Sequence, residues 1–239
     1  GASENGAGVY IGQKCATANI RRNNFYANKA GGDGGGLFLG SPMIMDASNK
    51  FITCNRAKNG GHIAVGEGGL LSIDGHTNGE FDFMNGLADN KGGAIYLTGS
   101  SGGGVNLYHN VRIFKNTATS GGGVAIEGGK FTTYSDADSV HIFLNTASQY
   151  GGGVYVGTNG RFETGSESGK YSYQTYINEN KAAKGGGLYE ATTTYSQPTY
   201  VTLMNVLMYC NEATEEGGAI YTNGNIGIDS VTGNLNKAP

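Results

Sequence analysis

Apolar and polar residues follow one repeating pattern along the chain. Its fullest copy, residues 142–157, reads "IFLNTASQYGGGVYVG": an apolar residue, Asn-x-Ala three positions later, a short loose stretch, glycines, and then alternating aliphatic residues. Repeats with a period near 30 residues indicate stacked units that share one core, because each unit is too small to bury a core of its own. The motif asparagine stands at Asn28, Asn55, Asn90, Asn116, Asn145, Asn180, Asn211 and Asn236.

The residues after the glycines alternate with period two, which predicts a short β-strand with one face turned inward. The first inward position is aliphatic in every copy: Val9, Leu37, Ile63, Ile95, Val124, Val154, Leu188 and Ile220. The second is Ile11, Leu39, Val65, Leu97, Ile126 and Val156 in six copies, and Glu190 and Thr222 in the other two.

A second strand is predicted before each asparagine, as at Val111 and Ile113, and a third, less regular one lies between the two. Glycine triplets and β-branched runs both oppose an α-helix. The sequence therefore predicts an all-β fold, a parallel β-helix of about eight coils with roughly 30 residues and three short strands per coil. Residues 1–239 are expected to form a single β-helix segment.

Glycine and asparagine have separate roles in this prediction. Glycine permits positive φ at a corner and lets the backbone of one coil lie close to the next. A corner asparagine tolerates the left-handed region, and stacked asparagines can pass amide hydrogen bonds along the solenoid as a ladder. The alanine two residues later leaves space inside the corner. We expect all eight motif asparagines to belong to this ladder.

Composition agrees with a thin, elongated core. The chain has 44 glycines among 239 residues, 38% hydrophobic residues and a net charge of −3. Without a basic patch, nucleic acid and anionic membrane surfaces are not expected partners. No apolar run approaches the roughly 20 residues needed to span a bilayer, so this segment is not expected to insert into a membrane. Three cysteines at unrelated spacings predict neither a disulfide framework nor a zinc site.

The motif resembles a known repeat. Gly-Gly-Ala-Ile at residues 92–95 and 217–220, with Phe-x-x-Asn at residues 25–28, is similar to the repeat signature of the chlamydial polymorphic outer membrane proteins. Gly-Gly-Gly-Val-Tyr with Asn-Thr-Ala also resembles the β-helix repeats of other bacterial surface proteins. The resemblance implies a right-handed β-helix at the cell surface or outside the cell, commonly as an adhesin or autotransporter passenger.

Catalytic chemistry is not expected, although some parallel β-helices are polysaccharide-active enzymes. Such enzymes gather acid and base groups on one face. Here His62, His76, His109 and His141 fall at different phases of the repeat, which favours surface or corner positions. Asp136 and Asp138 form the only tight aspartate pair, in a stretch typical of a solvated loop. The stretch "GGDGGGLFL" lacks the aspartate of a calcium-binding repeat, and no metal or cofactor site is predicted.

The middle residue of each strand after the glycines is expected to point outward and to form an aromatic stripe. Stacked coils are about 4.8 Å apart, so the rings can stabilise one another or form a contact surface for sugars or a partner. Ala64 and Ala125 interrupt the stripe. Its members are Tyr10, Phe38, Tyr96, Tyr155, Tyr189 and Tyr221.

The chain ends on "NKAP", and joining this end to residue 1 continues the motif. We therefore expect residues 1–239 to be one period of a tandem or head-to-tail array, in which each copy is the partner of the next. The expected function is an extracellular structural fibre; the alternatives are an adhesin that binds glycans or a host surface and, more remotely, a polysaccharide-active enzyme. The expected junction consists of Asn236, Ala238, Pro239, Gly1, Gly6, Gly8 and Val9.

Overall fold

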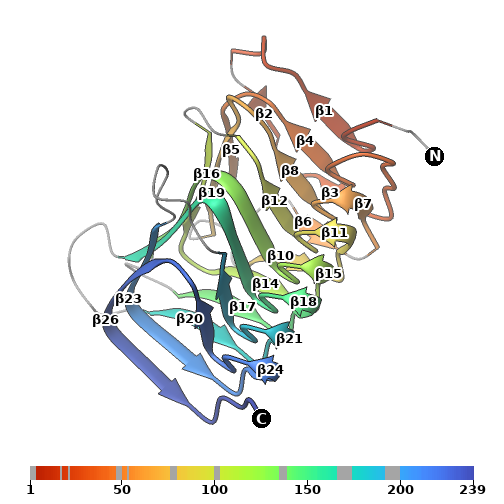
Figure 1. Ribbon diagram of the computed structural model, residues 1–239. Coiled ribbons are helices and arrows are strands. Elements are labelled where there is room, and N and C mark those ends of the chain that lie inside the picture. The colour runs from red at the N-terminus through yellow and green to blue at the C-terminus, as the bar shows by residue number, and fades with distance from the viewer. Residues whose placement is uncertain are drawn as a thin grey trace.

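A computed structural model gives the chain as a parallel β-solenoid (Figure 1). It describes residues 4–16, 18–20, 22–46, 50–52, 54–75, 80–99, 103–134, 139–165, 174–191 and 200–239. These residues form 26 strands and no helix. The predicted all-β parallel architecture is confirmed. The N-terminus lies at one end of the solenoid and the C-terminus at the other.

Equivalent strands of successive coils stack side by side. The strands after the glycines are β1 (Val9–Ile11), β4 (Leu37–Leu39), β8 (Ile63–Val65), β12 (Ile95–Leu97), β16 (Val124–Tyr134), β19 (Val154–Gly165), β22 (Leu188–Glu190) and β25 (Ile220–Thr222). The next set is β2 (Ala18–Asn19), β5 (Met43–Asp46), β9 (Leu70–Asp74), β13 (Gly104–Tyr108), the second halves of β16 and β19, and the first halves of β23 (Tyr200–Tyr209) and β26 (Asn225–Asn234).

The strands before the asparagines complete each coil. They are β3 (Asn24–Phe25), β6 (Lys50–Ile52), β10 (Phe81–Met84), β14 (Val111–Phe114), β17 (Val140–Phe143), β20 (Thr175–Asn178) and the second halves of β23 and β26. In every pair the strands are parallel and equivalent repeat positions lie opposite each other, so that Ile95 pairs with both Ile63 and Val124. We call each set of equivalent residues along the solenoid a column, and each level within a column a rung.

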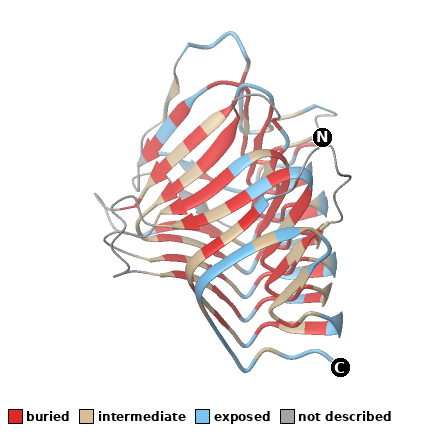
Figure 2. Cartoon of the chain, turned by 60° about the vertical axis from the view of Figure 1, so that its left-hand side comes forward, coloured by how far each residue is buried: buried red, intermediate tan, exposed pale blue. Residues whose placement is uncertain are grey.

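Aliphatic and aromatic side chains fill the interior as continuous columns. The predicted inward residues are buried from Leu37 to Leu188, and Phe81, Phe83, Phe131 and Phe162 widen the same core. Figure 2 shows the buried positions as bands that run across neighbouring strands. At the two exceptions to the pattern, Glu190 is buried and its carboxylate accepts the hydroxyl of Thr222, which is exposed in the next coil. Burial raises the pKa of Glu190.

Six of the corners contain a fourth short strand, where the sequence indicated only a loose stretch. These strands are β7 (Arg56–Asn59), β11 (Leu87–Lys91), β15 (Thr117–Ser120), β18 (Thr146–Tyr150), β21 (Lys181–Lys184) and β24 (Glu212–Glu216), and they form a separate six-stranded sheet. Parallel stacking pairs the backbone of each corner with the next, and a column of buried alanines, including Ala118 and Ala147, leaves room for the bend.

The solenoid has about six complete turns, fewer than the eight coils predicted from the motif count. Among the described residues, this six-stranded sheet continues at its ends only as isolated bridges. At one end Lys29 pairs with Arg56 and Asp33 with Asn59, and at the other Glu212 pairs with Lys237. The first and last motifs therefore belong to partial turns. Counting motif asparagines overestimates the complete turns, because a motif is present even where its corner strand is not formed.

The glycine corners have the two features that the sequence predicts. Gly92 has a φ of +67°, which side-chain-bearing residues rarely adopt. A Cβ atom on Gly93 would lie 2.1 Å from the carbonyl oxygen of Gly122 in the next coil. The first glycine therefore serves the backbone turn, whereas the second permits close approach between coils.

Candidate functional site

The motif asparagines form a buried hydrogen-bond ladder along one corner. At Asn145, the backbone N–H and the side-chain amide both donate to Oδ1 of Asn180 at 3.0 Å. The same amide donates to the carbonyl oxygen of Ile113 in the preceding coil at 2.9 Å. Asn145 Oδ1 in turn accepts the backbone N–H and the side-chain amide of Asn116. Each amide therefore links three coils, and the ladder extends from Asn28 to Asn55 and from Asn116 to Asn236.

Asn90 is not part of the ladder, and its prediction was wrong. It lies exposed on β11, while Gly86 occupies the ladder position of that coil. Asn116 Oδ1 accepts the backbone N–H of Gly86 at 2.8 Å, as it would from an asparagine there. The "N-x-A" pattern failed because the coil reads "NGLADNK": its alanine, Ala88, keeps the correct offset from Gly86, and Asn90 follows two residues later.

His62 fills the space that the missing asparagine leaves. Its ring is fully buried, so His62 is not a surface residue, although it does lie at a corner. A Cβ atom on Gly86 would lie 2.7 Å from Cδ2 and Nε2 of this ring. Other coils have Gly or Ala at the position of His62, for example Ala94 and Gly123. The large residue in one coil and the glycine in the next are therefore compensating departures from the repeat.

The partners of His62 determine its protonation state. The Asn55 amide can only donate, so His62 Nδ1 accepts at 2.9 Å and Nε2 carries the proton that it donates to the Met84 carbonyl oxygen at 3.1 Å. Burial lowers the pKa of His62 from 6.5 to about 4, outweighing the hydrogen bonds to Met84 and Asn116, which raise it. His62 is therefore neutral at physiological pH and bridges the interrupted ladder.

The left-handed backbone conformation occurs one residue before the motif asparagine rather than at it. Lys115 and Leu144 each have a φ of +56°. Positive φ therefore places Asn116 and Asn145 with their side chains inside the corner. The ladder asparagines are selected for buried amide hydrogen bonds, and the strained position accepts residues as different as lysine and leucine because its side chain faces outward.

The predicted aromatic stripe is a single column. Strand registers align Tyr10, Phe38, Ala64, Tyr96, Ala125, Tyr155, Tyr189 and Tyr221 in this order. The Tyr189 ring is parallel to those of Tyr155 and Tyr221, at centroid distances of 5.7 and 5.0 Å. Stacking therefore covers both faces of the Tyr189 ring and one face each of Tyr155 and Tyr221.

Charged groups fill the gap at Ala125, between Tyr96 and Tyr155. Lys91 and Glu127 form an ion pair there, and Lys91 Nζ lies 5.0 Å from the centre of the Tyr155 ring. Burial and the Glu127 charge raise the pKa of Tyr155. Ala125 itself is fully buried. The Lys91–Glu127 ion pair therefore takes the place of an aromatic ring at this position of the column.

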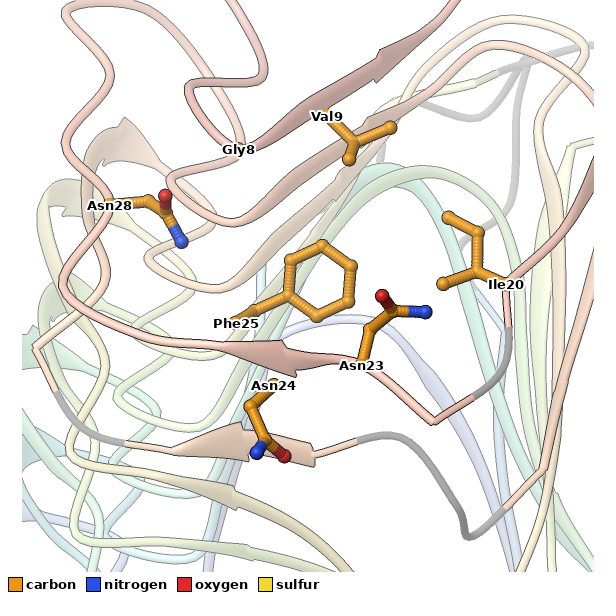
Figure 3. A pocket seen from close by; sticks show the side chains of 7 residues that line it. All are labelled: Gly8, Val9, Ile20, Asn23, Asn24, Phe25 and Asn28. Carbon is orange, nitrogen blue, oxygen red and sulfur yellow. The ribbon is translucent and has the colours of Figure 1, made fainter.

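The N-terminal end of the solenoid is hollow. Figure 3 shows Val9, Ile20 and Phe25 around an open cavity of about 430 Å³, with Asn28 at its edge. Tyr10 is 60% exposed: one face of its ring stacks on Phe38 at 5.1 Å, and no described residue stacks on the other face. Gly1 of the predicted junction lies outside the described residues.

The C-terminal end exposes the other side of the same core. Ile228 pairs in register with Leu203, which is fully buried, yet Ile228 is 56% exposed because nothing described covers the last rung. Figure 2 shows the exposure along this last strand, β26. Ala238 and Pro239 of the predicted junction are exposed here, and Asn236 of the junction is half-buried.

The remaining candidates for chemistry do not converge. His109 pairs with Asp74 at 3.0 Å, and His141 stacks on Tyr176 at 4.5 Å in a different column. His76, Asp136 and Asp138 lie outside the described residues. Within the described ranges, no group of three or more His, Cys, Asp and Glu side chains is placed to hold a metal ion. The same residues include no helix long and apolar enough to cross a membrane.

Comparison with known proteins adds no relative: no family model, curated protein or solved structure matches this chain. The geometry of the ladder, the aromatic column and the two ends is therefore the basis for a functional assignment. Sequence reasoning missed His62, although "GGHI" is the only corner with a bulky third residue. Gly86, which stands two residues before Ala88 where other coils have asparagine, could have been recognised as the residue that makes room for His62.

Proposed function

We propose that the chain is a structural β-solenoid that works outside the cell or at its surface and builds a fibre by end-to-end stacking of coils. One observation carries the proposal: the two ends present matching halves of the same core and the same ladder. An open hollow lined by Val9 and Phe25 lies at one end, and the uncovered Ile228 lies at the other. Uncovered strand edges of this kind readily accept another strand.

Electron microscopy of the purified chain over a range of concentrations tests this proposal. One copy has eight ladder rungs, so a single rod should be about 35–40 Å long at about 4.8 Å per rung. Stacking predicts unbranched rods whose mean length rises with protein concentration at a constant diameter. Short rods of one length at the highest soluble concentration would refute it.

An adhesin is the second candidate, supported by the resemblance to bacterial surface repeats and by the aromatic column. The parallel rings argue against sugar binding by ring faces, because stacking already covers both faces of Tyr189 and one face each of Tyr155 and Tyr221. A glycan array with the wild type and a Tyr96→Ser/Tyr155→Ser/Tyr189→Ser variant distinguishes the two. Glycan binding that the variant loses would favour the adhesin; no binding by either protein favours the structural role.

A further inference from the structure

The asparagine ladder has a direction, so its two ends differ. Wherever the next rung is also an asparagine, a ladder asparagine donates its backbone N–H and its amide to Oδ1 of that residue, toward the C-terminal side. At Asn211 these bonds to Asn236 Oδ1 are 3.0 and 2.9 Å. Among the described residues, nothing donates to Oδ1 of Asn28, and nothing accepts from the backbone N–H of Asn236. One end therefore keeps an acceptor and the other keeps donors, at the same position of the repeat.

The glycine corners have the same polarity. Gly6 N–H donates to the carbonyl oxygen of Asp33 at 2.9 Å, and Gly185 N–H donates to that of Glu216 at 3.0 Å. Gly217 is the next member of this column, and no described carbonyl accepts its N–H. Asn5, which precedes Gly6 as Glu216 precedes Gly217, has the matching carbonyl at the opposite end.

The side chains at the two ends also match in size. Strand registers place Phe25 at one end of a column whose last member is Gly233. The bulkiest core residue of the N-terminal rung would therefore meet a position without a side chain. In the aromatic column, the open face of Tyr10 would meet Tyr221, whose other face stacks on Tyr189.

From these three matches we infer that the N-terminal coil of a second copy of this chain seats on the C-terminal coil in one register that continues every column. Strand β1 of the second copy pairs with β25, and its β2 and β3 pair with β26. Asn28 Oδ1 of the second copy accepts the hydrogen bonds of Asn236. This inference rests on the proposed end-to-end stacking and specifies its partner and its register.

The proposed register also determines which charged residues meet at the joint, in the column that directly follows the ladder asparagines. Glu212 is followed by Lys237, with which it pairs, and the first member at the opposite end is the exposed Lys29, next to Arg56. The proposed joint therefore places Lys237 beside Lys29 of the second copy. Like charges on adjacent rungs repel, so the joint is weaker than its apolar contacts alone would make it.

Cysteine cross-linking tests the register directly. In a background with Cys15, Cys54 and Cys210 changed to Ser, Ala27→Cys and Leu235→Cys introduce exposed thiols one residue before Asn28 and Asn236. Neighbouring rungs are about 4.8 Å apart, which suits a disulfide. Oxidation should give a ladder of covalent oligomers in denaturing electrophoresis. Lys115→Cys with Leu235→Cys is the matched control, because residue 115 lies three rungs further from the joint.

Charge reversal provides a second readout that needs no oxidation. Lys29→Glu should lower the dissociation constant for end-to-end association by about three- to tenfold, because it turns a repulsion with Lys237 into an attraction. Lys58→Glu, one coil away from the joint, should leave it unchanged. Circular dichroism establishes that each variant is folded before association is measured.

The outcomes separate the register from the stacking itself. Rods without selective cross-linking, or with equal cross-linking in the control, would overturn the register and leave the proposed fibre intact. A chain that stays monomeric at the highest soluble concentration, with neither cross-links nor rods, would overturn both the register and the proposed fibre. Occupation of the exposed end of the solenoid by another segment of the chain would do the same. Selective cross-links together with tighter association of Lys29→Glu would support the inference.

Discussion

At the scale of single residues, His62 and Gly86 depart from the repeat together. An imidazole in one coil occupies the volume that an asparagine side chain fills in other coils, and glycine in the next coil makes room for it. The ring also preserves the polar continuity of the corner, since it accepts from Asn55 and donates to the Met84 carbonyl. Each departure would be unfavourable alone, because one creates a clash and the other leaves buried amide hydrogen bonds unmade.

Replacing His62 by alanine and Gly86 by asparagine restores the residue types of the regular repeat and tests whether the two departures compensate for each other. Gly86→Asn alone should reduce the free energy of unfolding by about 2–4 kcal/mol through overpacking against His62. His62→Ala alone should cost a similar amount, because it leaves a cavity and removes the acceptor of one Asn55 amide N–H. The double variant should recover at least about 1–3 kcal/mol of the summed loss, as expected for contacting residues. Urea denaturation of all four proteins measures this coupling, and additive losses would contradict it.

The buried His62 also predicts a pH dependence. Its pKa is lowered to about 4 in the folded chain, so the unfolded chain takes up this proton first as pH falls. The stabilisation is complete above about pH 6.5 and is lost progressively between pH 6.5 and pH 4. At about 1.4 kcal/mol per pKa unit, the loss over these roughly 2.5 units amounts to about 3.5 kcal/mol.

The His62→Ala/Gly86→Asn variant is the matched control for this pH dependence, because it keeps every other titrating group. Over that interval, the free energy of unfolding of the wild type should fall relative to that of the variant as the pH is lowered. Parallel pH profiles would contradict the assignment of a buried neutral imidazole.

At the scale of elements, many strands in this fold have only three or four residues. Such strands are too short to be stable alone, and they persist because each is paired on both sides in one register. The asparagine ladder fixes that register at one corner, since a slip by one residue would remove the amide from the interior. The aromatic column stabilises the adjacent strands from outside.

Asn145 and Asn90 provide a direct test of the ladder. Asn145→Ala removes an amide that bonds to Ile113 and Asn180 and accepts from Asn116, so we expect a loss of about 2–4 kcal/mol of unfolding free energy. Asn90→Ala, at an exposed position on β11, should change stability by less than about 0.5 kcal/mol. Thermal or urea unfolding compares the two; equal effects would argue against the ladder as a stabilising element.

The aromatic column should contribute through ring stacking. Tyr189→Ser removes the central ring of the Tyr155–Tyr189–Tyr221 stack and should cost about 1–3 kcal/mol, at about 0.5–1.5 kcal/mol for each of the two pairs. The same change at the exposed Tyr26 is the control and should have little effect on a dilute sample. Unfolding curves of similar midpoint for both variants would show that the rings do not stabilise one another.

At the scale of the whole molecule, the solenoid behaves as a one-dimensional stack in which each coil is held by its neighbours. A central strand such as β14 has partners on both sides, whereas among the described residues β26 is paired only with β23. Local stability should therefore fall toward both ends. In the proposed fibre the ends become interior rungs and gain the missing neighbour.

Hydrogen exchange at two protein concentrations tests whether local stability falls toward the ends, and whether assembly into rods removes this difference. In dilute solution, amides of β26 should exchange much faster than those of β14, because the end strand opens without disturbing the stack. Under conditions that give rods, exchange in residues 225–234 should slow by at least about tenfold while β14 stays unchanged. Equal exchange of β26 at the two concentrations would mean that its exposed edge is not the surface that assembles.

Several features followed from the sequence because they depend on local chemistry repeated along the chain. Period-two apolar positions predicted the inward columns, and glycine runs predicted the corners. The aromatic column followed from the same alternation. The corner strands were not predictable, because residues such as Thr117–Ser120 have no apolar alternation and are extended only through pairing with neighbouring coils.

What the sequence determined by itself was the repeat, and with it the parallel β-solenoid, since stacking identical positions is the only way for units of about 30 residues to share a core. What the tertiary structure decided were the exceptions. The exclusion of Asn90, the burial of His62 opposite Gly86 and the pairing of Glu190 with Thr222 all depend on contacts between coils. The direction of the ladder, and hence the complementarity of its ends, also becomes visible only when donors and acceptors are placed in space.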